Sequence, residues 1–323
     1  MAIQGEGRAF ELVRTPDGDR DAWLAQRRLG VGGSDVAAIM RLSPWRGAYE
    51  VWSEKSGLAE APDLSAKESV QWGNILEPVV GAHYAGLHPD REVRRVNAVC
   101  RSIARPWAQA SLDYEVRDPE LGWGVLEIKT AGLRSEPDWD GGVPLWYQTQ
   151  AAHYLSVTGR PFADVAVLIG GQAYREYRIM RDPDDIAAVD AAVDAFWRMV
   201  EGGEEPPLTG ASGEARALMQ RHPMAYEDII QVGETPAALS EYLAAKAAFD
   251  GAKKELDRRS VELKSEIGDA LGIDCPDGRV TWVRGTSTRF DRKRFDAENP
   301  GIYEKYCKLA PRDMGLRFRP RKE

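Results

Sequence analysis

The segment Val125-Leu126-Glu127-Ile128-Lys129-Thr130 decides the predicted fold and chemistry of this chain. On a β-strand, residues two positions apart face the same side. We therefore expect Glu127 and Lys129 to project together, while Leu126 and Ile128 face the core. A carboxylate beside an ammonium group suits metal-assisted hydrolysis, in which the carboxylate holds a divalent ion and the lysine orients or deprotonates the attacking water. The alternative is a surface ion pair on a strand.

A second acidic residue, Asp113, precedes this strand in the context Ala110-Ser111-Leu112-Asp113-Tyr114. The turn at residues 117–124 contains a proline and two glycines, which predicts a hairpin that can bring Asp113 beside Glu127. Two carboxylates near one lysine are costly without a cation, and hard oxygen ligands favour Mg²⁺ or Mn²⁺ over zinc. The carbonyl of Ile128 could supply a further ligand. The alternative is a hairpin whose acidic residues face water.

Glu77 is a third carboxylate, on a predicted helix from about residue 69 to residue 85. It lies beside the apolar stripe of that helix, so it is either a buried partner or an exposed edge residue. The apolar residues at core spacing on this helix are Trp72, Leu76, Val79, Val80 and Tyr84.

Gln150 lies in Tyr147-Gln148-Thr149-Gln150, on the helix that follows the lysine strand. An amide at this place could hold the water or a phosphate. From the residues alone, a polar helix surface is the favoured alternative.

A turn with the sequence Gly32-Gly33-Ser34-Asp35 begins another predicted helix. Such a turn presents free backbone N–H groups and a hydroxyl, which suit a phosphate, and Arg27 and Arg28 lie just before it. The alternative is ordinary helix capping by Ser34 or Asp35, which is the commoner use of such residues.

Charge is distributed unevenly along the chain, whose net charge is -8. Residues 279–323 contain 13 Lys and Arg and 6 Asp and Glu, a net of +7, so the rest of the chain carries -15. DNA-binding domains are usually basic. Any DNA contact by the acidic part therefore needs a local basic groove, a bound metal, or both.

Other functional classes lack their sequence signals. The three cysteines and four histidines show no disulfide or metal-ligand pattern, and nucleophile-elbow, Walker and dinucleotide-binding motifs are absent. We see no apolar run as long as a membrane span and no secretory signal. We therefore expect no membrane association and a cytoplasmic location.

The order of the predicted elements indicates an α/β (α+β) fold with a central mixed sheet flanked by helices. The segment EGGEEPP at 201–207 is a linker signal, which predicts a core domain at 1–205 and an accessory region at 206–323. The accessory region is expected to contain a long helix from about residue 236 to residue 271, a short strand and a basic tail. The strand-like segments of the core are 91–99, 107–116, 125–130, 163–171 and 174–180.

In this order, these elements resemble the YqaJ-type viral recombination exonucleases, a lambda-exonuclease-like family of the PD-(D/E)xK nuclease superfamily. The resemblance covers roughly residues 20 to 200, and it is specific because five weak motifs occur in the family's order. The superfamily's Pro-Asp is Leu112-Asp113 here, which keeps the carboxylate. The motifs are Arg28-Leu29-Gly30-Val31-Gly32-Gly33-Ser34-Asp35, Trp72-Gly73 with Glu77, Ser111-Leu112-Asp113, Leu126-Glu127-Ile128-Lys129 and Tyr147-Gln148-Thr149-Gln150.

The resemblance implies a restriction-endonuclease-like core and a catalytic centre that uses Mg²⁺ or Mn²⁺. It implies that Lys129 positions or activates the nucleophilic water. The implied metal-binding groups are Asp113, Glu127 and the carbonyl of Ile128. The implied supporting and lining residues are Glu77, Gln150 and Tyr147, and the candidates for gripping a 5′-phosphate are Arg28 and Ser34.

In that family, the reaction is 5′→3′ digestion of one strand of linear double-stranded DNA, which leaves a 3′ single-stranded tail. The resemblance thus implies double-stranded DNA ends as substrate, a RecT-like single-strand annealing protein as partner, a homo-oligomeric ring, and the cytoplasm of a bacterial host cell. The segment from about residue 208 has no counterpart in the minimal lambda-like enzyme. Its role is open between DNA tracking, oligomer contacts and docking of the annealing protein. Two rival functions are an endonuclease of the same superfamily and a catalytically inert DNA-binding recombination scaffold.

Overall fold

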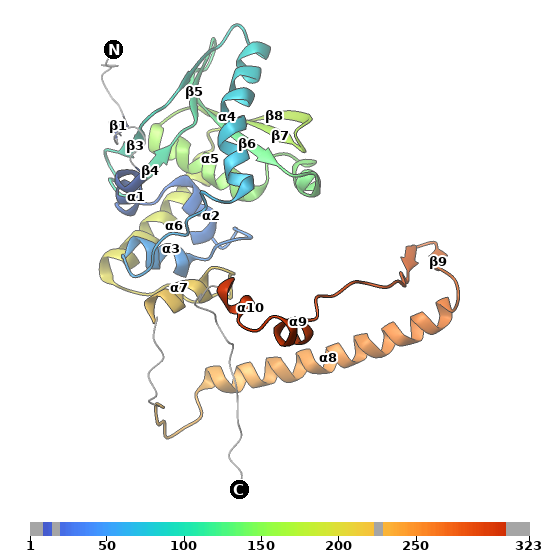
Figure 1. The fold of residues 1–323 in the computed structure, drawn as a ribbon. Helices are drawn as coiled ribbons and strands as arrows, with labels where there is room; N and C mark the ends of the chain where they lie inside the picture. The colour runs from blue at the N-terminus through green and yellow to red at the C-terminus, as the bar shows by residue number, and fades with distance from the viewer. Residues whose placement is uncertain (1–8, 15–19, 223–228, 308–323) are drawn as a thin grey trace. The chain divides into compact units, whose positions relative to one another are not determined.

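The computed structural model describes residues 9–14, 20–222 and 229–307 (Figure 1). The chain divides into two compact units, one up to Ala225 and one from Tyr226 onward. Helix α7 (Glu214–Arg221) follows the predicted linker, yet it packs against α3 (Ala48–Lys55) in the first unit. The division therefore falls later than the expected boundary between residues 205 and 206.

A five-stranded mixed sheet, in the order β2-β5-β6-β7-β8, forms the centre of the first unit. Strands β5 and β6 form the predicted antiparallel hairpin, and β6 and β7 are parallel. The connection between the parallel strands carries helix α5 (Leu145–Thr158), because parallel strands need a crossover. The predicted central mixed sheet flanked by helices is confirmed. Its strands are β2 (Glu92–Arg95), β5 (Tyr114–Asp118), β6 (Gly122–Ala131), β7 (Phe162–Ile169) and β8 (Ala173–Met180).

Residues 107–116 form parts of two strands, where one strand was predicted. Strand β4 (Gln109–Ser111) belongs to a separate three-stranded sheet of order β1-β3-β4, and β5 begins only at Tyr114. Asp113 therefore lies at the point where the chain passes from one sheet to the other. The partners of β4 in the small sheet are β1 (Phe10–Val13) and β3 (Val99–Ser102).

Helices cover both faces of the central sheet. Helix α4 (Glu68–Leu87) packs on one face, where its Tyr84 joins Leu126 in a buried cluster. Helix α5 packs on the other face, where its Leu155 joins Val125, and it also contacts α6 (Pro183–Gly202) and α2 (Gly33–Ile39). The first unit also contains α1 (Arg20–Arg28) and the 3-10 helix η1 (Leu133–Trp139).

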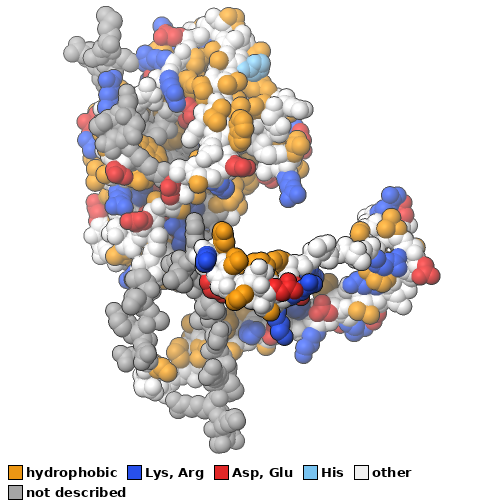
Figure 2. Space-filling model, viewed as in Figure 1, with side chains coloured by type: hydrophobic (Ala, Val, Ile, Leu, Met, Phe, Trp, Pro, Cys, Tyr) orange, Lys and Arg blue, Asp and Glu red, His pale blue; other side chains and the backbone are white. Residues whose placement is uncertain are grey.

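The outer face of α4 is apolar. Val80 and Tyr84 are buried as predicted, but the expectation was wrong for Trp72 and Val79, which are both 58% exposed. Hydrophobic side chains gather along this helix in Figure 2. The inner face approaches the sheet closely, since a Cβ on Gly81 would lie 2.9 Å from the ring of Tyr114. Gly81 therefore occupies a point of the contact where a larger residue does not fit, beside the buried Val80 and Tyr84.

The second unit contains the predicted long helix, α8 (Ala237–Ile267), which ends before the expected residue 271. The predicted short strand is β10 (Gly278–Thr281), which pairs with β9 (Gly272–Cys275). Two short helices follow, α9 (Arg292–Glu298) and α10 (Ile302–Lys305). The last part of the predicted basic tail, residues 308–323, lies outside the described residues.

Among the described helices, none combines the length and the apolar character that crossing a membrane requires.

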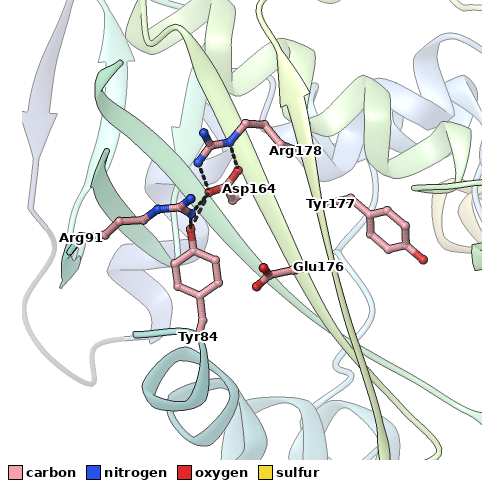
Figure 3. A pocket seen from close by; sticks show the side chains of 6 residues that line it. All are labelled: Tyr84, Arg91, Asp164, Glu176, Tyr177 and Arg178. Atoms are coloured by element: carbon pink, nitrogen blue, oxygen red, sulfur yellow. Dashed lines mark hydrogen bonds and ion pairs between the residues drawn. The ribbon is translucent and has the colours of Figure 1, made fainter. Parts of the chain in front are cut away.

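A cluster of buried charges joins α4 to the sheet (Figure 3). Asp164 of β7 is 3% exposed and accepts hydrogen bonds from Tyr84 at 2.5 Å and from Arg91 at 3.1 Å. Arg178 of β8 binds the same carboxylate at 2.7 and 2.8 Å, and it binds Asp118 at 2.9 Å. Two arginines thus balance two aspartates, as expected of a structural cluster.

We expect Asp164→Ala to lower the free energy of unfolding by about 2 kcal/mol, because it removes the shared partner of the half-buried Arg91, of Arg178 and of the buried Tyr84 hydroxyl. Glu176→Ala is the matched control, since Glu176 lines the same pocket but is exposed and contacts His88 and Tyr174. Its loss should stay below about 1 kcal/mol. Urea unfolding measures both, and equal losses would contradict a special role of the buried carboxylate.

Candidate active site

Strand β6 carries the predicted pair of charges. Leu126 and Ile128 pack in the cluster beneath α4, so Glu127 and Lys129 project to the opposite side, as the alternation predicts. Lys129 Nζ donates to Glu127 Oε1 at 2.6 Å. Glu127 is only 6% exposed, so the alternative of a surface ion pair is wrong. The pair is buried.

Asp113 lies at the open edge of β6. Pairing between β5 and β6 ends at Tyr114 and Leu126, so the rest of β6 has a neighbour only on the β7 side. Asp113 Oδ2 accepts a hydrogen bond from the backbone N–H of Ile128 at 2.8 Å. In a strand, the N–H and C=O of one residue point to the same side. The carbonyl of Ile128 therefore points into the gap beside Asp113.

Gln150 of α5 is buried against both charges. Its Nε2 donates to Glu127 Oε1 at 2.7 Å, and its Oε1 accepts from Lys129 Nζ at 3.2 Å. The favoured alternative of a polar helix surface is therefore wrong. Tyr147, on the same helix, places its ring 4.6 Å from Lys129 Nζ, which is a cation–π distance.

Glu77 reaches the same site from α4. A cleft of about 240 Å³ is bounded by Glu77, Asp113, Glu127 and Lys129. Arg95 of β2, which the sequence did not single out, donates to Glu77 Oε1 at 3.0 Å. Burial and the nearby Asp113 raise the pKa of Glu77. The structure therefore brings Glu77 within electrostatic reach of the two predicted metal-binding carboxylates.

Carboxylates outnumber cations in this cleft. Burial raises the pKa of Glu127 to about 8, and Asp113 and Glu77 add to the rise although Lys129 opposes it. Burial also raises the pKa of Asp113. Burial lowers the pKa of Lys129, but the attraction of Glu127 and Asp113 outweighs it and raises that pKa overall. The protonated form of Lys129 is therefore favoured in this cleft, and simultaneous ionisation of Asp113, Glu127 and Glu77 is unfavourable.

One oxygen of Glu127 has no partner among the described residues. Oε2 is buried and makes no hydrogen bond. Together with Asp113 and the carbonyl of Ile128, it forms a set of hard oxygen donors that fits Mg²⁺ or Mn²⁺. Within the described ranges, no three His, Cys, Asp or Glu side chains are arranged as a metal cluster. Two carboxylates suffice for Mg²⁺, which usually binds one or two of them and completes its shell with water and substrate phosphate.

The Gly32-Gly33-Ser34-Asp35 turn forms a second charged site. Asp35 is fully buried; its Oδ2 lies 2.8 Å from Lys55 Nζ and accepts from the N–H of Gly32 at 3.1 Å, and its Oδ1 lies 3.3 Å from Arg46. Burial alone raises the pKa of Asp35, but Lys55, Arg27 and Arg46 reverse this and lower it well below its usual range. The N-cap of α2 is Gly32, so neither Ser34 nor Asp35 is the predicted cap, but Asp35 satisfies the N–H of Gly32 in a capping box and also gathers three cations.

Ser34 is contacted by Arg27, whose Nη2 donates to Ser34 Oγ at 3.0 Å. Arg28 is exposed and, with Arg27, Arg46 and Lys55, lines a cleft of about 460 Å³. The sequence did not single out Arg46 and Lys55, because they lie in later segments that only the fold brings to the turn. The predicted Arg28 and Ser34 are therefore two members of a larger basic site.

We expect Glu127→Gln to stabilise the metal-free protein at pH 9 and to change its stability little at pH 5. The wild-type carboxyl keeps its proton up to about pH 8 in the folded state but only to about pH 4.5, its ordinary pKa, when unfolded. Between these two pH values, the carboxyl of Glu127 lowers the free energy of unfolding progressively as the pH rises. The neutral amide of the Glu127→Gln variant has no such effect. Thermal unfolding in a chelating buffer measures the effect. The same pH dependence in both proteins would contradict it.

Structures of LHK-Exo, an alkaline exonuclease from Laribacter hongkongensis, show limited similarity to the chain. The structure in complex with dAMP is 22% identical with a TM-score of 0.46, and it covers 57% of this chain and 94% of that one. A second LHK-Exo structure is 21% identical with a TM-score of 0.45 and has the same coverage.

Sequence comparison identifies the domain that contains the site. The chain is 29% identical over 307 residues to the uncharacterized protein YqaJ of Bacillus subtilis (strain 168), which covers 93% of this chain and 95% of that protein. Residues 22–161 match the family model of the YqaJ-like viral recombinase domain, and this segment includes every predicted site residue. The segment that carries the predicted site residues is therefore similar to the YqaJ-like viral recombinase domain.

Proposed function

We propose that this chain is a metal-dependent exodeoxyribonuclease that hydrolyses one strand of linear double-stranded DNA. The observation that carries the proposal is the environment of Glu127, whose Oε1 is held by Lys129 and Gln150 while its buried Oε2 has no hydrogen-bond partner in the described part of the chain. A buried carboxylate oxygen left unpaired beside Asp113 is costly unless a cation binds it. Similarity to a viral recombinase domain supports DNA as the substrate.

The side chains of the cleft suit hydrolysis of a phosphodiester. Because neighbouring carboxylates raise the pKa of Lys129, its Nζ remains an ammonium group that can orient a water and neutralise charge on the phosphate. Gln150 fixes that ammonium and Glu127 in one geometry. When bound, Mg²⁺ or Mn²⁺ would polarise the phosphate and ease deprotonation of the water. Glu77 supports the site from α4, through its charge and its bond to Arg95.

We further propose that the basic cleft beside Ser34 receives the 5′-terminal phosphate, with Arg27 and Arg28 as its exposed cations. Arginine presents a fork of donors that matches a phosphate. This arrangement favours 5′→3′ digestion and a 3′ single-stranded product. A homo-oligomeric ring and a RecT-like annealing partner stay hypotheses that follow from the family resemblance.

We expect Lys129→Ala and Glu127→Ala each to lower the rate of strand hydrolysis at least about a thousandfold, because both remove charge that acts on the reacting phosphate. Binding of duplex DNA should survive. End-labelled linear duplex with Mg²⁺ measures hydrolysis, and filter binding in Ca²⁺ measures affinity. Lys246→Ala on α8 is the control, since this lysine pairs with Asp250 on the same helix. Undiminished hydrolysis in either active-site variant would refute the assignment.

We expect the wild-type protein to degrade linear duplex and to leave covalently closed circular duplex intact. We also expect Arg27→Ala and Arg28→Ala to reduce any preference for 5′-phosphorylated over 5′-hydroxyl ends by about tenfold, because a charge-assisted hydrogen bond is lost. Cutting of closed circles would establish the endonuclease instead. A protein that binds DNA but cleaves no blunt, recessed or 5′-phosphorylated end with Mg²⁺ or Mn²⁺ would be the inert scaffold.

A further inference from the structure

We propose that Tyr154 is a positioning residue that holds the Gln150 amide in the one orientation that serves both Glu127 and Lys129. We also propose that Gly33 is needed because only glycine leaves room for this arrangement. The inference rests on the proposed nuclease function and adds two residues to its machinery, neither of which touches the reacting atoms.

The hydroxyl of Tyr154 decides the orientation of the amide by its hydrogen-bond capacity. It donates its only proton to the backbone carbonyl of Ser111 at 2.9 Å. Burial and the neighbouring carboxylates raise the pKa of Tyr154 well above its usual value, so this proton stays in place. The hydroxyl oxygen can then only accept, and it accepts from Gln150 Nε2 at 2.8 Å.

The NH₂ group of Gln150 must therefore face Tyr154 and Glu127, which it bonds at 2.8 and 2.7 Å. Its carbonyl oxygen is left to face Lys129 Nζ at 3.2 Å. In the flipped amide, the NH₂ group would oppose the lysine ammonium and the oxygen would oppose the carboxylate. The Tyr154 hydroxyl excludes that state, because the flipped amide would also leave it without a donor.

The packing around Tyr154 holds its hydroxyl in a fixed position. It is 4% exposed and packs in the core cluster that contains Leu112 and Val125. Its acceptor, Ser111, ends β4 and precedes Asp113 by two residues. One hydroxyl thus ties the Gln150 amide of α5 to the strand break that presents Asp113.

Gly33 packs directly on this pair. A Cβ at position 33 would lie 2.9 Å from Gln150 Cγ and closer still to Tyr154 Cε1. The ring is buried and cannot yield without moving its hydroxyl, so a larger residue would displace the amide. Because Gly33 belongs to the Gly32-Gly33-Ser34-Asp35 turn, the basic site and the hydrolytic site share this contact.

The test begins with Tyr154→Phe, which keeps the ring and removes the hydroxyl. We expect kcat on 5′-phosphorylated linear duplex with Mg²⁺ to fall about tenfold, while KM and thermal stability change little, because one positioning hydrogen bond is lost. Tyr49→Phe is the matched control, since Tyr49 is equally buried and its hydroxyl accepts from Arg221 at 3.1 Å, outside both sites. It should keep the wild-type kcat.

The decisive measurement repeats Tyr154→Phe in a Gln150→Ala background. If the hydroxyl acts only through the amide, the second substitution should cause no further loss of kcat. The same tenfold loss in both backgrounds would overturn the inference, as would a folded Tyr154→Phe protein with full kcat.

Gly33→Ala provides an independent arm, with Gly86→Ala as its control because a Cβ at Gly86 meets nothing within 4 Å. We expect Gly33→Ala to lower kcat at least as much as Tyr154→Phe, and a wild-type kcat would overturn the role of Gly33. A wild-type protein that is inactive with both Mg²⁺ and Mn²⁺ would refute the proposed function itself.

Discussion

The early end of the β5–β6 pairing is the constraint on which the hydrolytic site depends. As far as Leu126, strand β6 has a neighbour on each side; beyond it, only β7 remains. The N–H of Ile128 would then be an unpaired buried donor, and Asp113 satisfies it with a side-chain oxygen. If the pairing extended two residues further, so that Leu112 lay opposite Ile128, backbone groups would fill the gap and the carbonyl of Ile128 would be hydrogen-bonded within the ladder. The early end of the β5–β6 pairing therefore leaves a gap at the edge of β6 in which the hydrolytic site can form.

Three buried carboxylates in the first unit show how local charge balance separates structure from function. Asp164 shares two arginines with Asp118, so its cluster is neutral and holds α4 to the sheet. Glu127 lies among excess carboxylates, and its site gains by taking up a cation. Asp35 is surrounded by Lys55, Arg27 and Arg46, which keep its carboxylate ionised, and Arg46 also pairs with Glu54. We assign the carboxylate-rich site of Glu127 to a metal, and the cleft that Arg27 and Arg28 line to a phosphate.

Much of the site could be predicted from local patterns, while its packing could not. Strand alternation and the turn at residues 117–124 were sufficient to place Glu127, Lys129 and Asp113 together. Alternation also caused an error, because the buried residues Ala108, Ala110, Leu112 and Tyr114 keep a period of two across a break between two sheets. A pattern of burial shows which side faces inward but not which sheet a residue joins.

Helices were harder to interpret for a similar reason. The spacing of residues in a helix predicts which side chains share one face, but it does not predict what packs against that face. Gln150 is polar yet buried because charges from β6 meet it, whereas Trp72 is apolar yet 58% exposed on α4, whose buried contact with the sheet includes Val80 and Tyr84. Tyr154 and Gly33 matter only through each other, and they are 121 positions apart in sequence, so no local pattern connects them.

The acidic net charge of the chain does not prevent a DNA end from binding, because salt screens the interaction between distant exposed charges. On α8, the charges cancel within the helix through pairs such as Lys246–Asp250 and Lys253–Asp257. At physiological salt, exposed charges are screened beyond about 8 Å, so distant acidic residues contribute little at a binding cleft. The cations at that cleft are Arg27, Arg28, Arg46 and Lys55, and its acidic lining residues are Asp21, Glu54 and Glu60. Of the cations, Arg28 is exposed, whereas Lys55 is buried against Asp35. Local composition, rather than the total of -8, therefore determines which ligand this surface can hold.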